Sequence, residues 1–364
     1  MDDVEVPKDD VVHEQAAPPG RSRAARWLLV ALNCGMLAVG TAGGPLMTRL
    51  YFSKGGQRQW LSAWLQISGW PLLLVPVAAS YVSRRARDRG APLLLTPPRV
   101  LLAGVALGVL TGADTFMYAY GLEYLPVSTS AILSSTQLAF TVLFAFLIVR
   151  QRLTAATLNA VALLTAGAVV LGLHVSNDRP AGVTKARYWM GFFLTLGAAA
   201  LYGLILPLVE LAYKRSAGGG RAVTYALVME LQLVMGFFST AFCTVGTIVN
   251  KDFQAIPREA REYELGEARY YTVLVWSAIV WEFFFLGSVG VIFCVNTLLA
   301  GILIAVFIPI TEVMGVIFLH EKFSREKGVA LVLALWGLAS YSYGEYSEAK
   351  AKKRAAASEA ETSS

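Results

Sequence analysis

The sequence predicts an all-α integral membrane protein with ten transmembrane helices. Of its 364 residues, 56% are hydrophobic and only 15% are charged, and the mean hydropathy of +0.55 is too high for a soluble protein of this length. Apolar runs long enough to span a bilayer recur from end to end. Eight Trp and thirty-two Gly fit the same class, because Trp favours the lipid interface and Gly lets neighbouring helices approach closely.

The ten spans are read from these apolar runs. A helix needs about 20 mostly apolar residues to cross the hydrocarbon core, and it satisfies its own backbone hydrogen bonds there. The runs are 27–48, 60–81, 99–120, 126–149, 154–174, 188–212, 222–248, 270–290, 295–319 and 327–346. The boundary between the eighth and ninth is the least defined, because the stretch around Gly290, Asn296 and Thr297 contains no charge. Nine or eleven spans therefore stay open.

Polar tails flank the spans. Residues 1–20 are acidic and Pro-rich, which does not fit a cleavable signal, so 1–26 is predicted to be a disordered cytosolic tail. Residues 347–364 are also predicted to be a disordered tail.

Basic residues predict the orientation, since cytoplasmic loops retain Lys and Arg. With the N-terminus inside and ten spans, eighteen of the thirty-one Lys and Arg fall on the cytosolic side. Both termini are therefore predicted to be cytoplasmic.

A weak internal sequence repeat divides the predicted spans into two halves. At an offset of 170, RQRLTAATLNAVALLTAG (150–167) aligns without a gap with HEKFSREKGVALVLALWG (320–337). Few aligned residues are identical, so a chance match between hydrophobic helices is the alternative. A true repeat would place 27–174 and 188–346 as five-helix halves, and an odd number of spans per half would invert them relative to each other.

Motifs for other chemistry are missing from the sequence. The three cysteines, Cys34, Cys243 and Cys294, lie inside apolar segments and have no metal-ligand spacing. No nucleophile with a base and no grouped His and acids indicate an enzyme. We therefore expect no metal, no cofactor and no catalytic residues.

Six stretches spread along the chain resemble the plant purine permeases, a branch of the drug/metabolite transporter superfamily. They are GGQRQWLSAWLQISGWP (55–71), YGLEYLPVSTS (120–130), TQLAFTVLFAFLIVRQRLT (136–154), YGLILPLVELAYK (202–214), VMELQLVMGFFSTAFCTVG (228–246) and EKFSREKGVALVLALWG (321–337). Together they cover most of the membrane portion.

The resemblance implies two inverted five-helix repeats and proton-coupled uptake of adenine, cytokinins or related purines, driven by the proton gradient. Some relatives accept alkaloids or vitamers instead, and a membrane receptor is the rival outside transport. The expected partners are a purine-like molecule, protons and membrane lipid but no nucleic acid, and the expected location is the plasma membrane. The oligomeric state is not predicted. The sequence departs from the family at Glu282, where Gln is frequent, at Asn296–Thr297, which replaces a pair of Ser, and at 112–121, which lacks a second acid.

Four acids within the spans are candidates for the proton site. A charge at bilayer depth is costly, so it faces a partner or a wet cavity, and a buried carboxyl can take up and release a proton near neutral pH. In order of preference the candidates are Glu282, Glu312, Glu230 and Asp114. The alternative for each is a hydrogen bond or ion pair that only holds the bundle together.

A purine pocket needs an aromatic on the ring face and amides or hydroxyls at the ring edge. Candidate polar groups are Asn33, Thr129, Ser134, Gln137 and Asn296, and candidate stacking partners are Trp64, Tyr118, Tyr202 and Trp281. The alternative is that an amide bridges two helices and an aromatic fills the core or lies in the interface belt. Phosphorylated ligands are disfavoured, because the basic residues lie at span ends or in loops.

Overall fold

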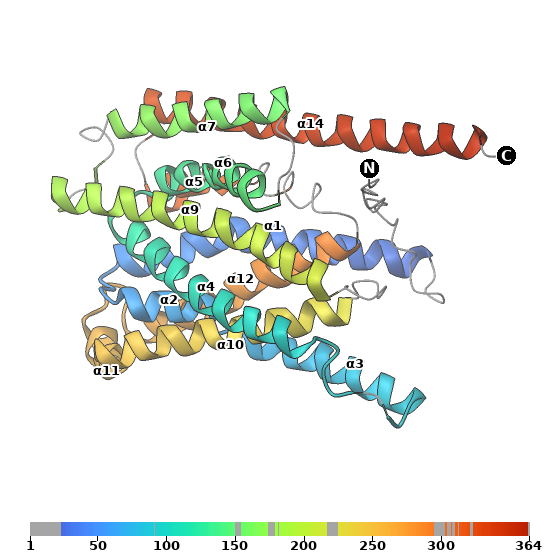
Figure 1. Cartoon of the computed structure of the whole chain (residues 1–364). Coiled ribbons are helices and arrows are strands. Elements are labelled where there is room, and N and C mark those ends of the chain that lie inside the picture. Colours follow the sequence, from blue (N-terminus) through green and yellow to red (C-terminus); the bar gives the residue numbers. More distant parts are fainter. Residues whose placement is uncertain are drawn as a thin grey trace.

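The protein folds into a bundle of long helices, seen here in a computed structural model. The structure describes residues 23–90, 92–149, 154–173, 179–180, 182–216, 225–294, 303, 307, 310–311, 313–320 and 323–362. Most helices run along one common direction (Figure 1). That direction is the membrane normal of the predicted spans.

The first part of the chain alternates long and interrupted helices. The elements are α1 (Arg23–Ser53), α2 (Gln59–Ile67), a 3-10 turn η1 (Trp70–Leu73), α3 (Leu74–Arg87), α4 (Pro98–Tyr124), α5 (Val127–Ser135), α6 (Gln137–Phe144), a π-helical turn (Ala145–Val149) and α7 (Ala155–Leu173). The second predicted span is thus broken between α2 and α3, and the fourth between α5 and α6.

The second part contains longer helices and one short helix outside the spans. The elements are α9 (Lys185–Ser216), α10 (Tyr225–Val249), α11 (Asp252–Glu262), α12 (Glu267–Cys294) and α14 (Arg325–Thr362). Residues 347–362, predicted to be a tail, continue α14 as a helix, because this Ala-, Glu- and Lys-rich stretch consists largely of strong helix formers.

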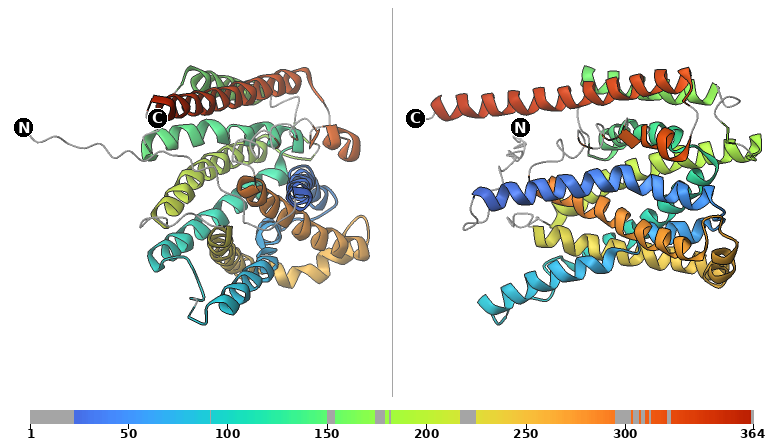
Figure 2. Two further views of the ribbon diagram at one scale, coloured as in Figure 1. Left: turned by 90° about the vertical axis from the view of Figure 1, so that its right-hand side faces the viewer. Right: turned by 180° about the vertical axis from the view of Figure 1, so that it is seen from behind.

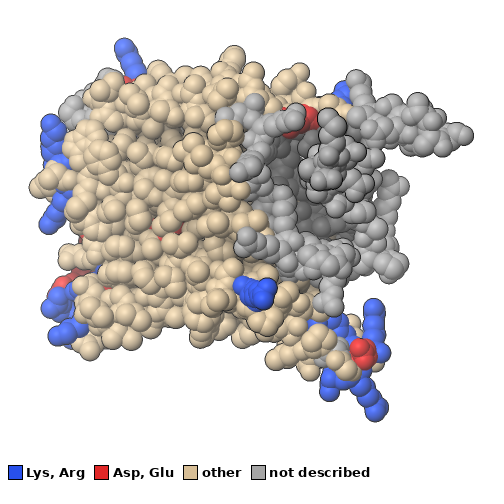
Figure 3. Space-filling model, viewed as in Figure 1, with Lys and Arg blue, Asp and Glu red and all other residues tan. Residues whose placement is uncertain are grey.

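Eight helices among the described residues are long and apolar enough to cross a membrane. Most of the predicted ninth span lies outside the described residues. Large apolar side chains such as Phe193, Val245 and Trp276 point outward. A broad uncharged band separates the charged residues near one end of the bundle from those toward the other (Figure 3). These features establish a multi-pass membrane protein.

Helices distant in sequence pack in pairs: α1 against α12, α4 against α9, α7 against α14, and α2 against α10. Glycines allow the closest approach, because a Cβ at Gly40 or Gly287 would collide with the backbone of the facing helix. In Figure 1 and in the right-hand view of Figure 2, α1 begins and α14 ends at the same end of the bundle, whereas α11 lies at the opposite end.

Candidate functional site

A cavity of about 180 Å³ lies between the central helices. Its wall is formed by α1, α2, α4, α5, α6, α9 and α12, so both halves of the chain contribute. The lining residues are Thr41, Pro45, Gln66, Asp114, Thr115, Tyr118, Ala131, Ser134, Ser135, Gln137, Ala198, Ala199, Tyr202, Trp281, Phe284, Phe285 and Thr311. The cavity is therefore mostly apolar and aromatic, with a few polar groups, as in binding sites for small heterocyclic molecules.

Trp281 is the fixed point of the aromatic wall. Its indole nitrogen donates a hydrogen bond of 3.0 Å to Thr48 Oγ1 on α1, and its ring packs where a Cβ at Gly44 would lie. Tyr118 meets the indole edge-on, with ring centroids 5.9 Å apart and planes at 86°, and Phe284 lies 6.0 Å away at 79°. A hydrogen-bonded ring held on three sides is pre-organised to contact a flat ligand.

Asp114 provides the acidic group of the cavity. It is 9% exposed, and its Oδ1 has no hydrogen-bond partner among the described residues. Because a buried carboxyl without a partner is costly, this group is available to a ligand or a proton.

Six of the predicted site residues line the cavity together: Asp114, Tyr118, Ser134, Gln137, Tyr202 and Trp281. Asn296 and Glu312 lie outside the described residues. The remaining five, Asn33, Trp64, Thr129, Glu230 and Glu282, are absent from the cavity wall.

Asn33 and Trp64, two of these five residues, donate structural hydrogen bonds. Asn33 donates to the carbonyl of Leu29 in its own helix, at 2.8 Å, and its side chain fills the space beside Gly290 on α12. Trp64 donates from its indole nitrogen to Thr244 Oγ1 at 2.9 Å. Both side chains pack helices together, which is the alternative role expected of such groups.

Glu230 braces the end of the bundle where α4 begins. Its carboxylate accepts hydrogen bonds from the Leu95 and Thr96 amides at 2.7 and 3.0 Å and from the Thr96 hydroxyl at 3.0 Å. Arg84 adds an ion pair of 3.3 Å. With three hydrogen bonds from the loop between α3 and α4 and an ion pair from Arg84 on α3, Glu230 is occupied in joining this region to α10.

Glu282 and Thr129 are buried outside the cavity wall. Glu282 is 3% exposed, and its Oε1 has no hydrogen-bond partner among the described residues. Its carboxyl group lies against Gly69, in the break between α2 and η1. Thr129 is fully buried within α5.

Several cavity residues were missed by the sequence analysis, among them Gln66, Phe284 and Phe285. The phenylalanines occur in an apolar run, where nothing distinguishes core from cavity. Gln66 had a usable signal, because it is an amide inside the second predicted span.

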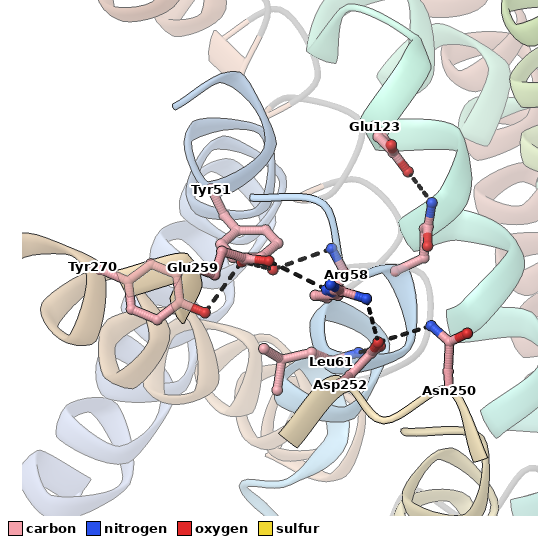
Figure 4. Close-up of polar contacts among 9 residues, drawn as sticks. Tyr51, Arg58, Leu61, Glu123, Asn250, Asp252, Glu259 and Tyr270 are labelled. Atoms are coloured by element: carbon pink, nitrogen blue, oxygen red, sulfur yellow. Dashed lines mark hydrogen bonds and ion pairs between the residues drawn. The ribbon is translucent and has the colours of Figure 1, made fainter. Parts of the chain in front are cut away.

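A second polar cluster lies at the end of the bundle beside α11 (Figure 4). We call Tyr51, Arg58, Asp252, Glu259 and Tyr270 the α11 latch. Glu259 Oε1 accepts hydrogen bonds from the Tyr51 and Tyr270 hydroxyls at 2.5 and 3.1 Å. The Arg58 guanidinium lies 3.5 Å from both Glu259 and Asp252, which ties the loop between α1 and α2 to α11.

Asp252 anchors the start of α11. It accepts hydrogen bonds from the Asn250 side chain at 2.8 Å and the Leu61 amide at 3.3 Å. Burial raises the pKa of the Asp252 carboxyl above its ordinary value, although Asn250 and Arg58 oppose that shift.

Comparison with known proteins supports the resemblance seen in the sequence. A family model described as purine nucleobase transmembrane transport matches residues 28–351. The chain belongs to the purine permease family. The permease is 47% identical over 329 residues to purine permease 3 of Arabidopsis thaliana, covering 90% of this chain and 93% of that relative. It is 45% identical to purine permease 2 of the same plant, covering 89% of this chain and 94% of that relative.

A further relative is probable purine permease 5 of Arabidopsis thaliana, which is 36% identical over 89% of this chain and 87% of its own length. The family consists of transporters, so the prediction that the permease is not an enzyme is confirmed.

Proposed function

We propose that the permease is a proton-coupled importer of purine nucleobases and related compounds, including adenine and cytokinins, in the plasma membrane. The observation that carries the proposal is the central cavity, whose wall combines aromatic rings with a buried acid, Asp114, whose Oδ1 has no hydrogen-bond partner within the described part of the chain. The transport of purine nucleobases by this family and the names of its Arabidopsis members support the substrate class.

The size of the cavity suits a small flat base. The cavity volume of about 180 Å³ is many times the space that a single buried water molecule needs. That space is suited to a bicyclic heterocycle. Trp281 and Tyr118 present ring surfaces for stacking, and Ser134 and Gln137 present polar groups to the ligand edge.

Asp114 is the favoured proton site, since it is the acid that the described part of the cavity wall contains. A protonated carboxyl can donate its O–H to a purine ring nitrogen, whereas the ionised form cannot. Substrate and proton then stabilise each other's binding, as a symporter requires. Glu282 is the second candidate, being buried and one residue from Trp281 but outside the wall.

The proposed transport cycle is alternating access between two inverted five-helix halves. The pairing of helices supports it. If the halves are exchanged, the α1–α12 pair corresponds to α9–α4, while the α7–α14 and α2–α10 pairs correspond to themselves. Rocking about such a pseudo-two-fold axis would expose the cavity to each side in turn. We orient the permease with both termini on the cytoplasmic side, so the end of the bundle beside α11 faces the outside of the cell.

The test is uptake of labelled adenine and a labelled cytokinin by cells that lack purine uptake, at external pH 5 and pH 8. We expect saturable uptake that is faster at pH 5. Asp114→Asn should lose this pH response, whereas Glu282→Gln should retain it. Glu230→Gln is the matched control, because its carboxyl braces a loop and should leave the pH response unchanged in the protein that reaches the surface.

Other outcomes would redirect the assignment. If Glu282→Gln rather than Asp114→Asn abolishes the pH response, the proton site moves to Glu282. If the wild type reaches the surface and transports neither compound, the purine assignment fails, and alkaloids and other heterocycles become the next substrates to test.

A further inference from the structure

Gln66 occupies an unusual place in the second span. It is the last residue but one of α2, and only Ile67 separates it from Ser68 and Gly69, which interrupt the helix before the 3-10 turn. The side chain lines the cavity. Interrupted spans are common at transporter binding sites, where the helix break brings polar groups to the ligand.

The amide of Gln66 has an unmet hydrogen-bond donor. The residue is 2% exposed, and its Nε2 has no hydrogen-bond partner among the described residues. A buried donor of this kind destabilises a fold by about 1–3 kcal/mol. An apolar side chain of similar shape would avoid that cost, so the amide is expected to bind a ligand rather than to stabilise the bundle.

Other polar groups on the cavity wall behave differently. The hydroxyls of Thr41, Thr115 and Thr311 donate to the carbonyl one turn earlier in their own helices, at 2.7, 2.8 and 2.9 Å. Their donors are therefore used within the helix. Within the described wall, only Gln66 and Asp114 have a buried side-chain nitrogen or oxygen without a partner.

We propose that Gln66 is a specificity-determining residue, whose Nε2–H donates a hydrogen bond to a ring nitrogen of the bound purine. This rests on the proposed function, because the purine supplies the acceptor. Ring nitrogens accept hydrogen bonds in the ring plane, while the aromatic wall covers the faces. A base with carbon in place of that nitrogen leaves the Gln66 donor unpaired. A site built to form a hydrogen bond with its substrate binds an analogue without the acceptor much more weakly.

The experiment compares adenine with 1-deaza-, 3-deaza- and 7-deazaadenine, each lacking one ring nitrogen. Half-saturation concentrations are measured by competition against labelled adenine, in wild type and Gln66→Met. Met has a similar unbranched shape but no donor. Gln59→Met is the matched control, because Gln59 also lies on α2 but donates to Glu123.

We expect wild type to bind two of the three analogues more weakly than adenine: one lacks the ring nitrogen that accepts from Asp114, and the other, about tenfold weaker, lacks the ring nitrogen that accepts from Gln66. In Gln66→Met, adenine and this second analogue should bind equally, while Gln59→Met should keep the tenfold ratio. If Gln66→Met is absent from the surface, Gln66→Asn, which retracts the amide, should give the same loss of discrimination.

Two results would overturn the proposal. One is unchanged analogue ratios in Gln66→Met, and the other is a wild type that binds all three analogues as well as adenine. Both differ from failure of the proposed function, in which the wild type at the surface takes up no adenine.

Discussion

The α11 latch and the central cavity both bury polar side chains among apolar helices, but they differ in whether the protein itself provides hydrogen-bond partners for those side chains. In the latch, Glu259 and Asp252 each have several partners from the protein (Figure 4). In the cavity, Asp114 and Gln66 each have a buried polar atom with none among the described residues.

The difference teaches how to separate structural from functional polar groups in a membrane bundle. A polar group satisfied by the protein adds to stability or specificity of the fold. An unsatisfied group weakens the fold, and it is expected where a ligand supplies the missing partner. Glu230 falls on the structural side by this criterion, because three hydrogen bonds from the loop before α4 and an ion pair from Arg84 on α3 hold its carboxylate.

The largest expected effect is at the latch. Arg58→Ala should lower the free energy of unfolding by about 3 kcal/mol, because it leaves two buried carboxylates without their cation. Thermal unfolding of the purified permease in detergent measures this. Lys54→Ala, which removes an exposed ion pair to Glu264 at the same end, should leave the melting temperature nearly unchanged. Equal changes in melting temperature for the two substitutions would contradict the distinction between the buried latch and the exposed ion pair.

Replacing an unsatisfied polar group of the cavity should not lower the thermal stability, in contrast to the replacement of Arg58 in the latch. Asp114→Asn should leave the thermal stability of the ligand-free permease unchanged or raise it by up to about 1 kcal/mol, because a neutral amide is cheaper than an ionised carboxylate to bury without a partner. Unfolding of the same purified variant in the absence of purine measures this. A destabilisation as large as that of Arg58→Ala would mean that Asp114 has a structural role.

The smallest effect concerns the pH dependence of the latch. Because burial raises the pKa of Asp252, the folded state holds a proton where the unfolded state has lost it. This carboxyl's contribution to stability therefore falls as pH rises from the ordinary value of 3.8 through the raised value, and is constant above it. Asp252→Asn should remove that slope. The free energy of unfolding, measured from pH 4 to pH 7 for wild type and Asp252→Asn, tests this prediction. The same dependence on pH in both proteins would contradict it.

The sequence alone determined the class of the protein and part of the site. Hydropathy is a property of consecutive residues, so the apolar runs could be read directly. Tyr118, Gln137, Tyr202 and Trp281 were selected as polar or aromatic groups within those runs, and they do line the cavity. The resemblance of six motifs was sufficient to predict the family.

Only the tertiary structure decided which buried polar groups have partners. Glu230 and Thr96 are 134 positions apart, and Trp64 and Thr244 are 180 apart, so neither hydrogen bond could be read from local sequence. Gln66 and Gln59 lie on the same short helix, yet the Gln59 amide donates to Glu123, while the Gln66 Nε2 has no hydrogen-bond partner in the part of the chain that the structure describes. Composition describes the groups that a helix offers, whereas packing with distant helices fixes which of them remain available to a ligand.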